Sequence, residues 1–178
     1  MTYKSSDNKY LKLLQGMKTF KEFLDESSLA RIKSKSDKGG IATMSASRAD
    51  KSAKENRARA KQLDKDIRGR GLGGATKVTG SYMEKDKETG KEKKVKERSH
   101  VVSSGKMGKR KFKKTVKALG KKYGQDSVLT QTKKTGTLPA TRKGGLGKAK
   151  NVKLGKFKPQ GKNPEGQSQI KGKTFTYG

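Results

Sequence analysis

The sequence predicts an α+β protein, a small two-layer α/β sandwich with flexible basic extensions at its N- and C-terminal ends. In the middle of the chain, short β-prone runs alternate with two segments whose apolar residues recur at helical spacing. Only 28% of the 178 residues are hydrophobic, too little apolar material for a core that runs through the whole chain. The C-terminal end is rich in lysine and glycine and sustains no period. We therefore expect one domain between two extensions.

The expected division has three parts. Residues 1–40 form an N-terminal amphipathic leader and linker, residues 41–132 an α/β domain, and residues 133–178 a basic Gly/Lys-rich tail. In the first part, Phe20, Phe23 and Leu24 fall at i, i+3 and i+4 and predict about two turns of amphipathic helix. So short a helix is marginal alone and must dock on something. Residues 27–40 are polar without a period and predict a linker.

The predicted domain begins with a strand, IATMSA, and a capped helix. Ser52, followed by Glu55 three residues later, forms a capping box that predicts the start of this helix. Ala60, Leu63 and Ile67 then recur at helical spacing, and the glycines of the following GRG stop the helix.

A hairpin, a second helix and a last strand complete the predicted domain. GATKVTGSYME and VKERSHVVSS predict two strands joined by the charged turn KDKETGKEKK. Phe112, Val116, Leu119 and Tyr123 form one apolar stripe on the helix that follows, and SVLTQT predicts the final strand. The resulting order, β-α-β-β-α-β, predicts a split βαβ or ferredoxin-like arrangement with both helices on one face of the sheet.

The tail after residue 132 predicts a flexible arm. It contains the three prolines of the chain, many glycines and one acidic residue, Glu165. Such a composition gives no reason to assign secondary structure. The last residues, KTFTYG, recover a strand-like alternation that leaves open a return of the terminus to the sheet edge.

The charge of the chain predicts a polyanionic partner. Lys and Arg number 47 against 16 Asp and Glu, a formal net charge of +31, and nucleic acid relieves such self-repulsion. Lysine outnumbers arginine, which favours phosphate contacts with double-stranded DNA, or alternatively RNA, over base reading. The basic residues are spread along the chain and not gathered beside an apolar anchor, so no membrane partner is expected. The candidate nucleic-acid-binding residues are Lys109, Arg110, Lys111, Lys113, Lys114, Lys117, Lys121, Lys122, Arg142, Lys143, Lys148 and Lys150.

Catalysis finds little support in the residue types. The chain has no cysteine and a single histidine, His100, which leaves no His-based metal cluster and no companion for a triad. Glu84, Glu97 and Asp126 could meet at one sheet end as a magnesium site of a nuclease. Ion pairing of Glu97 with neighbouring lysines is the simpler interpretation. We therefore expect no enzyme, no cofactor, no resident metal and no catalytic residue.

The domain resembles a domain-of-unknown-function family of bacteria and tailed phages. A Ser–x3–Asn helix start, a Glu–x–Ser strand and a Tyr–Gly–Gln ending carry the resemblance, which covers residues 41–131 and implies a fold but no established activity. The matching positions are Ser52, Asn56, Arg59, Gly80, Glu97, Ser99, Gly124 and Gln125.

A second resemblance concerns the N-terminal helix. MKTFKEFLDE, residues 17–26, is similar to the capsid-targeting leaders of the internal head proteins of T-even-type phages. Leu24 and Glu26 fit the Leu/Ile–x–Glu signal of the prohead protease of those phages, which implies cleavage between Glu26 and Ser27. In those leaders the segment starts at the chain terminus, whereas sixteen residues precede Met17 here. The alternative is a helix that packs on the domain.

Together these observations predict a phage virion or head-associated basic protein that binds nucleic acid non-specifically through phosphates. Capsid or scaffold proteins are the expected protein partners. The expected location is the virion, inside or on the head, and the host cytoplasm during assembly. The alternatives are a structural protein whose basic arms thread through a capsid or ribonucleoprotein assembly and, third, a metal-dependent nuclease.

Overall fold

The computed structural model describes residues 20–85, 89–141, 151–163 and 166–177. In this part of the chain, nine strands form one antiparallel sheet in the order β6-β5-β4-β1-β3-β2-β8-β9-β7. The strands are β1 (Ile41–Ser45), β2 (Gly73–Lys85), β3 (Glu92–Ser103), β4 (Leu129–Gln131), β5 (Gly136–Pro139), β6 (Asn151–Leu154), β7 (Phe157–Pro159), β8 (Gly166–Ile170) and β9 (Lys173–Tyr177). The helices are α2 (Phe20–Lys38), α3 (Ala53–Gly69) and α4 (Lys109–Lys122).

The sheet curls strongly on itself. β1 and β9 are separated by three strands in the sheet order, and strands lie about 4.8 Å apart. A flat sheet would therefore hold them nearly 20 Å apart by this spacing. Instead, the hydroxyl oxygens of Thr43 on β1 and Tyr177 on β9 are 3.1 Å apart. The sheet is a half-barrel, with an inner face to which these two side chains belong and an outer face on its other side.

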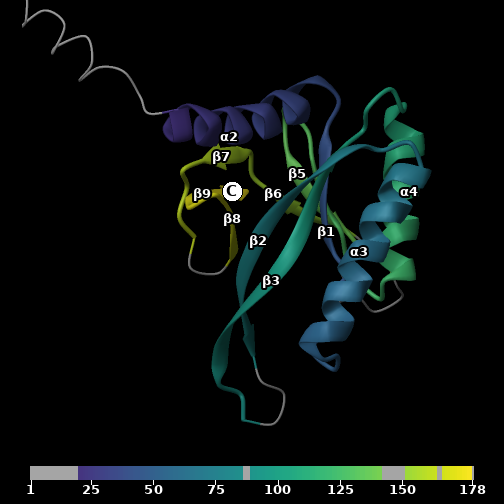
Figure 1. Ribbon diagram of the computed structural model, residues 1–178, viewed down its shortest axis with the longest axis vertical. Coiled ribbons are helices and arrows are strands. Elements are labelled where there is room, and N and C mark those ends of the chain that lie inside the picture. Colours follow the sequence, from purple (N-terminus) through teal and green to yellow (C-terminus); the bar gives the residue numbers. More distant parts are fainter. Residues whose placement is uncertain (1–19, 86–88, 142–150, 164–165, 178) are drawn as a thin grey trace, which may run out of the picture.

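Helices α3 and α4 cover the outer face, whereas α2 lies across the strands at the C-terminal end of the chain (Figure 1). The hairpin of β2 and β3 extends away from both layers as the longest strand pair, from Thr76 opposite Val101 to Lys85 opposite Glu92.

The core of the outer face is built from the stripes of α3 and α4. Its buried residues are Ala42, Met44, Ala46, Leu63, Ile67, Leu72, Val102, Phe112, Val116, Leu119, Tyr123 and Val128. Ser52 begins α3 with a complete capping box, in which its side chain accepts from the backbone of Glu55 and the Glu55 carboxylate accepts from its backbone. Gly71, at φ +70°, follows the helix where a side chain would be strained.

The core of the inner face joins the two ends of the described chain. Its buried residues are Leu29, Ile32, Ile41, Val78, Val101, Ile170 and Phe175, with Phe157 and Tyr177 packed against them. Leu29 and Ile32 come from α2, whereas Phe175 comes from β9. The helix is therefore docked on the half-barrel through two apolar side chains.

The predicted fold class is wrong. A small two-layer sandwich with flexible basic extensions would leave one face of the sheet bare and end near residue 132. The sheet instead continues through β5–β9 and curls, so the predicted tail supplies strands of the same sheet. The strands β5 to β8 were missed because they are three to five residues long, too short for alternation to stand out among lysines and glycines.

Most individual elements of the predicted domain are present, although the predicted fold class is wrong. The two helices and their apolar stripes, the β2–β3 hairpin and the strands at β1 and β4 are confirmed. The expected linker at 27–40 is helical as far as Lys38. The KTFTYG segment contains β9, which pairs with β8 and β7. The division of the chain at residues 40 and 132 stays a prediction.

Candidate functional site

A row of polar side chains crosses the inner face of the half-barrel. Glu97 on β3 lies opposite Gly80 on β2, and Gly80 lies opposite Ser168 on β8. The next row toward β1 holds Ser99, paired with Ser45. Ser45, Ser99 and Ser168 are all buried. Hydroxyls and a carboxylate therefore line a face where a purely structural sheet would carry apolar groups.

Gly80 places no side chain between the polar groups of this row. A side chain built there would place its Cβ 3.4 Å from the Ser99 hydroxyl and 3.8 Å from Cγ of Glu97. Glycine therefore leaves the carboxylate and the hydroxyl bordering the same space on the inner face, and a larger residue would fill it.

An aromatic cluster borders the polar row. Ser168 lies opposite Phe175 on β9, and the ring centroid of Phe175 is 5.2 Å from that of Phe157 and 5.8 Å from that of Tyr177. The Tyr177 hydroxyl reaches across the half-barrel to Thr43, and its burial raises the pKa of the phenol. The hydroxyl therefore stays neutral at physiological pH and acts as a hydrogen-bond donor or acceptor only.

Ser45 is held in place by the backbone. Its hydroxyl donates to the carbonyl of Arg98 at 2.8 Å and accepts from the backbone N–H of Ser47 at 3.0 Å. Both contacts fix the chain where β1 ends, beside the polar row. The Ser45 side chain is therefore fixed in one orientation. Both of these bonds are to backbone groups and neither is to a basic side chain, so they do not activate the hydroxyl as a nucleophile.

Glu97 differs from the other described acids in its place, because it lies on the inner face of the half-barrel beside buried hydroxyls. Asp66 accepts from Lys122, Tyr123 and Gln62, and the bond from Lys122 is the main reason for its lowered pKa. Other acids away from the inner face also have partners, among them Asp37 with Lys33, Asp50 with Arg48, Glu55 with the Ser52 cap and Asp64 with Lys77. Glu97 is half-buried on the inner face, where negative charge is scarce in a chain of net charge +31.

A second titratable group lies on the outer face beneath α3. His100 is 2% exposed, and its Nε2 is 3.1 Å from Oδ1 of Asp64, whose other oxygen is 3.2 Å from Nζ of Lys77. The ring nitrogens of His100 make no well-aligned hydrogen bond among the described residues. Burial lowers the pKa of His100 even though Asp64 opposes that effect. Its neutral form is therefore part of the outer core.

The positions of the first family resemblance fall into two groups. Asn56 bonds the backbone of Arg48 and Lys51, and Arg59 bonds the carbonyls of Ala46 and Tyr123. These contacts hold the chain around α3. Gly80, Glu97 and Ser99 instead meet on the inner face. Sequence reasoning named these three residues but did not bring them together, because the register of β2 against β3 was not part of the hairpin prediction.

The predicted nucleic-acid-binding lysines on α4 are exposed. Lys109, Arg110, Lys111, Lys113, Lys114, Lys117, Lys121 and Lys122 all lie on its solvent side. One of them, Lys122, makes a 2.6 Å ion pair with Asp66. Arg142, Lys143, Lys148 and Lys150 lie outside the described residues. Nucleic-acid binding by these side chains stays a prediction.

The predicted processing residues Leu24, Glu26 and Ser27 lie within the backbone range of α2. Their side chains are outside the described residues, and cleavage there stays a prediction. So do the capsid and scaffold partners and the virion location. No helix in the described part of the chain is long and apolar enough to cross a membrane.

The predicted magnesium site is not found among the described residues, and the side chain of Glu84, one of its three predicted ligands, lies outside them. No group of three or more His, Cys, Asp or Glu side chains is placed there to hold a metal ion. Glu84 lies opposite Lys93, near the tip of the hairpin, whereas Glu97 lies opposite Gly80. Four residues of strand, about 13 Å, therefore separate the positions of Glu84 and Gly80 along β2.

The inner face of the half-barrel thus presents a carboxylate, hydroxyls and aromatic rings together. This combination is suited to a small polar, cationic molecule. The chain belongs to the S-adenosylmethionine lyase family, whose model matches residues 42–178, more than half of the chain. No curated protein matches it significantly.

This membership corrects the function expected from composition. The expectation of a non-enzymatic, nucleic-acid-binding head protein is wrong, because the family is one of enzymes. The arm-threading and nuclease alternatives are corrected with it. The error came from reading the net charge of +31 as a statement about function, whereas net charge constrains solubility and non-specific association.

Proposed function

We propose that this protein is an enzyme that cleaves S-adenosylmethionine, with its site on the inner face of the half-barrel. The observation that carries the proposal is the family match over residues 42–178. The matched segment includes both α3 and α4 and every strand from β2 to β9, and it therefore includes the whole polar row around Glu97.

The charge of the substrate suits this row. S-adenosylmethionine carries a sulfonium and an ammonium against one carboxylate, so it is a net cation. A protein with 47 basic residues repels such a molecule except where negative charge and aromatic faces are concentrated. Glu97 supplies the carboxylate, and the cluster of Phe157, Phe175 and Tyr177 supplies rings at the same face.

The chemistry of a lyase needs no water and no oxidant. A carbon–sulfur bond of the sulfonium breaks, and its electron pair stays on sulfur to give a neutral thioether. The carbon left behind is satisfied either by attack of the substrate's own carboxylate, which closes a lactone, or by transfer of a neighbouring proton to a base such as a carboxylate, which forms a double bond. Attack by the carboxylate removes a positive and a negative charge together, so a site that excludes water favours it.

Each residue of the row then has a definite role. Glu97 binds the ammonium or sulfonium and orients the amino-acid portion toward the reacting carbon. Ser99 and Ser168 offer hydroxyls for the polar atoms of the substrate, and Tyr177, kept neutral by burial, donates or accepts a hydrogen bond without adding charge. The buried rings around them exclude water.

The test is to incubate the purified protein with S-adenosylmethionine and follow the products by mass spectrometry. We expect methylthioadenosine to accumulate together with a lactone or an unsaturated amino acid, and the mass of that second product identifies the reaction. Failure of the wild-type protein to consume S-adenosylmethionine would overturn the proposed function.

Glu97→Gln tests the assignment of the site. We expect turnover to fall by about 100-fold, because removing a charged group from a preorganised site costs on that order. Glu92→Gln is the matched control, since Glu92 lies on the same strand and is exposed; its turnover should stay within about twofold of wild type, as expected for a surface change. Equal turnover in the two variants would place the substrate away from the polar row.

A further inference from the structure

A cavity of about 370 Å³ lies between α2 and β2, apart from the polar row. Six residues line it, Ser28, Arg31 and Lys35 from α2 and Ala75, Thr76 and Lys77 from β2. Its volume is within the range of small-molecule sites. None of the six carries a negative charge, so the chemistry of this cavity is opposite to that of Glu97 and its neighbours.

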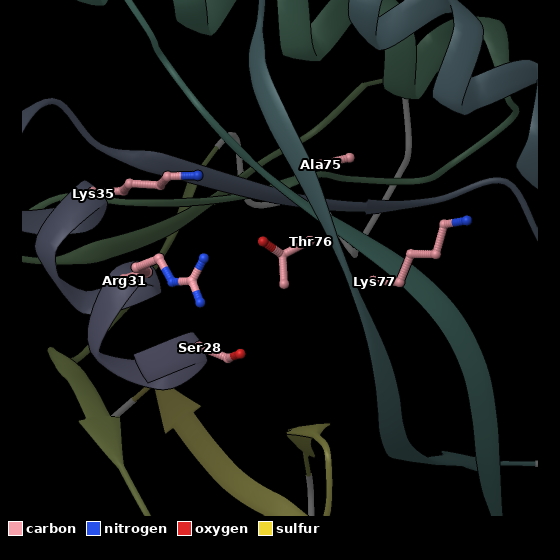
Figure 2. A pocket seen from close by; sticks show the side chains of 6 residues that line it. All are labelled: Ser28, Arg31, Lys35, Ala75, Thr76 and Lys77. Atoms are coloured by element: carbon pink, nitrogen blue, oxygen red, sulfur yellow. The ribbon is translucent and has the colours of Figure 1, made fainter. Parts of the chain in front are cut away.

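The helical wall of the cavity is a regular polar stripe. Ser28, Arg31 and Lys35 are spaced i, i+3 and i+7, which places them on one side of α2. Figure 2 shows the three side chains extending from α2 toward β2, with the Arg31 guanidinium directed at the middle of the cavity. Leu29 and Ile32 hold the helix to the inner core, so the stripe is fixed against the strand.

The strand wall adds hydrogen-bond donors. β8 pairs with β2 from Thr79 to Tyr82, and in the described part of the chain no strand pairs with the same edge at residues 75–77. In an antiparallel strand, alternate residues turn their backbone N–H groups away from the existing partner. At least one backbone N–H among these residues therefore points to this edge of β2. The Thr76 hydroxyl also faces Arg31 across the space (Figure 2).

Lys77 does not contribute its charge to the cavity. Its side chain turns away from the other five in Figure 2, and its Nζ lies 3.2 Å from Asp64 beneath α3. The positive charge that faces the cavity therefore comes from Arg31 and Lys35. An arginine fork with neighbouring lysine, hydroxyl and backbone donors is the arrangement that binds phosphoryl oxygens.

We propose that this cavity binds a small phosphorylated anion and is separate from the substrate site. Arg31 binds two phosphoryl oxygens, Lys35 neutralises the remaining charge, and Ser28, Thr76 and the β2 edge donate hydrogen bonds. The cavity repels a sulfonium, so its ligand differs from the proposed substrate. Residues 28, 31 and 35 precede the segment matched by the family model. The proposed site therefore needs α2 as well as the matched half-barrel.

The experiment follows backbone amide chemical shifts at residues 75–77 while inorganic phosphate, and separately glycerol 3-phosphate, is added at constant ionic strength. We expect saturable shifts in the wild-type protein. They should weaken by about tenfold or more in apparent Kd in the double variant Arg31→Ala/Lys35→Ala, which loses the charge-assisted bonds. Tighter binding of the ester than of inorganic phosphate would support an organic phosphate as the ligand, and the reverse order would support the free ion.

The control removes the same charge elsewhere at the same spacing. Arg110→Ala/Lys114→Ala takes two exposed cations from α4 and should leave the shifts and the apparent Kd unchanged. Thr76→Val keeps the volume of its side chain and should weaken binding without unfolding α2. Equal weakening in both double variants, or shifts that never saturate, would overturn the proposal as simple charge screening. Saturable shifts caused by S-adenosylmethionine at the same amides would overturn the separation of the two sites.

Discussion

The cores on the two faces of the half-barrel differ in which segments of the chain supply their residues. The outer core takes five of its twelve buried residues from two helices with regular apolar stripes, so each helix carries its own signal in consecutive turns. The inner core takes one or two residues from each of many segments, from Leu29 on α2 to Phe175 on β9. The outer face is specified locally, whereas the inner face is specified by which segments meet. Catalysis is proposed for the face that local patterns describe least.

The largest expected effect tests whether both cores belong to one cooperative unit. Phe175→Ala and Phe112→Ala each remove a buried ring, one from the inner core and one from the outer core. Each should lower the free energy of unfolding by about 3–5 kcal/mol in urea denaturation. Met83→Ala, at an exposed position, should change it by less than about 0.5 kcal/mol. A Phe175→Ala protein that keeps wild-type stability would show that β9 is dispensable.

A smaller difference separates the buried tyrosines of the two faces. The Tyr123 hydroxyl donates to the Asp66 carboxylate at 2.8 Å on the outer face, whereas Tyr177 exchanges a bond with the neutral Thr43 hydroxyl. Tyr123→Phe should therefore cost about 1.5–3 kcal/mol and Tyr177→Phe about 0.5–1.5 kcal/mol, because bonds to charged groups are stronger. Thermal unfolding of the two variants side by side measures this order, and the reverse order would contradict it.

Removing the capping box at the start of α3 tests how much a local sequence signal contributes to the stability of the outer face. Ser52→Ala removes the side chain that accepts from the Glu55 backbone and should lower stability by about 1 kcal/mol. Ser34→Ala, at an exposed position within α2, serves as the control and should cost nothing measurable. A Ser52→Ala protein as stable as wild type would mean that packing alone sets the start of α3.

The smallest expected effect is a pH dependence confined to the outer face. Burial lowers the pKa of His100 below its ordinary value of 6.5, so the unfolded chain binds the proton more readily. The stability that the neutral ring contributes is fully present above pH 6.5 and declines as the pH falls below it. His100→Gln should flatten the slope of unfolding free energy between pH 7 and about 5.5, since His100 is the only histidine. An unchanged slope would contradict this assignment.

Local patterns predicted much of the outer face and little of the inner one. The stripe of Phe112, Val116, Leu119 and Tyr123 was predictable because four apolar residues at helical spacing are a strong signal for an amphipathic helix. Ile170 and Phe175 could not be assigned a core, because each lies in a strand of only five residues that offers one or two large apolar side chains. Glu97 was named as a candidate ligand, but the hairpin prediction did not include the register that sets Gly80 opposite it, and Ser168 joins them through a pairing over a long separation.

The contact between Thr43 and Tyr177 joins residues 134 positions apart in the sequence. A contact of such separation forms late, because the entropy of closing the intervening chain must be met first. During synthesis, the outer face can assemble around α3 and α4 while the C-terminal strands are still being made. The inner face has no closing strand until Phe175 and Tyr177 emerge. A chain that stopped a few residues early would thus retain its helical layer and lose the wall that completes the proposed substrate site.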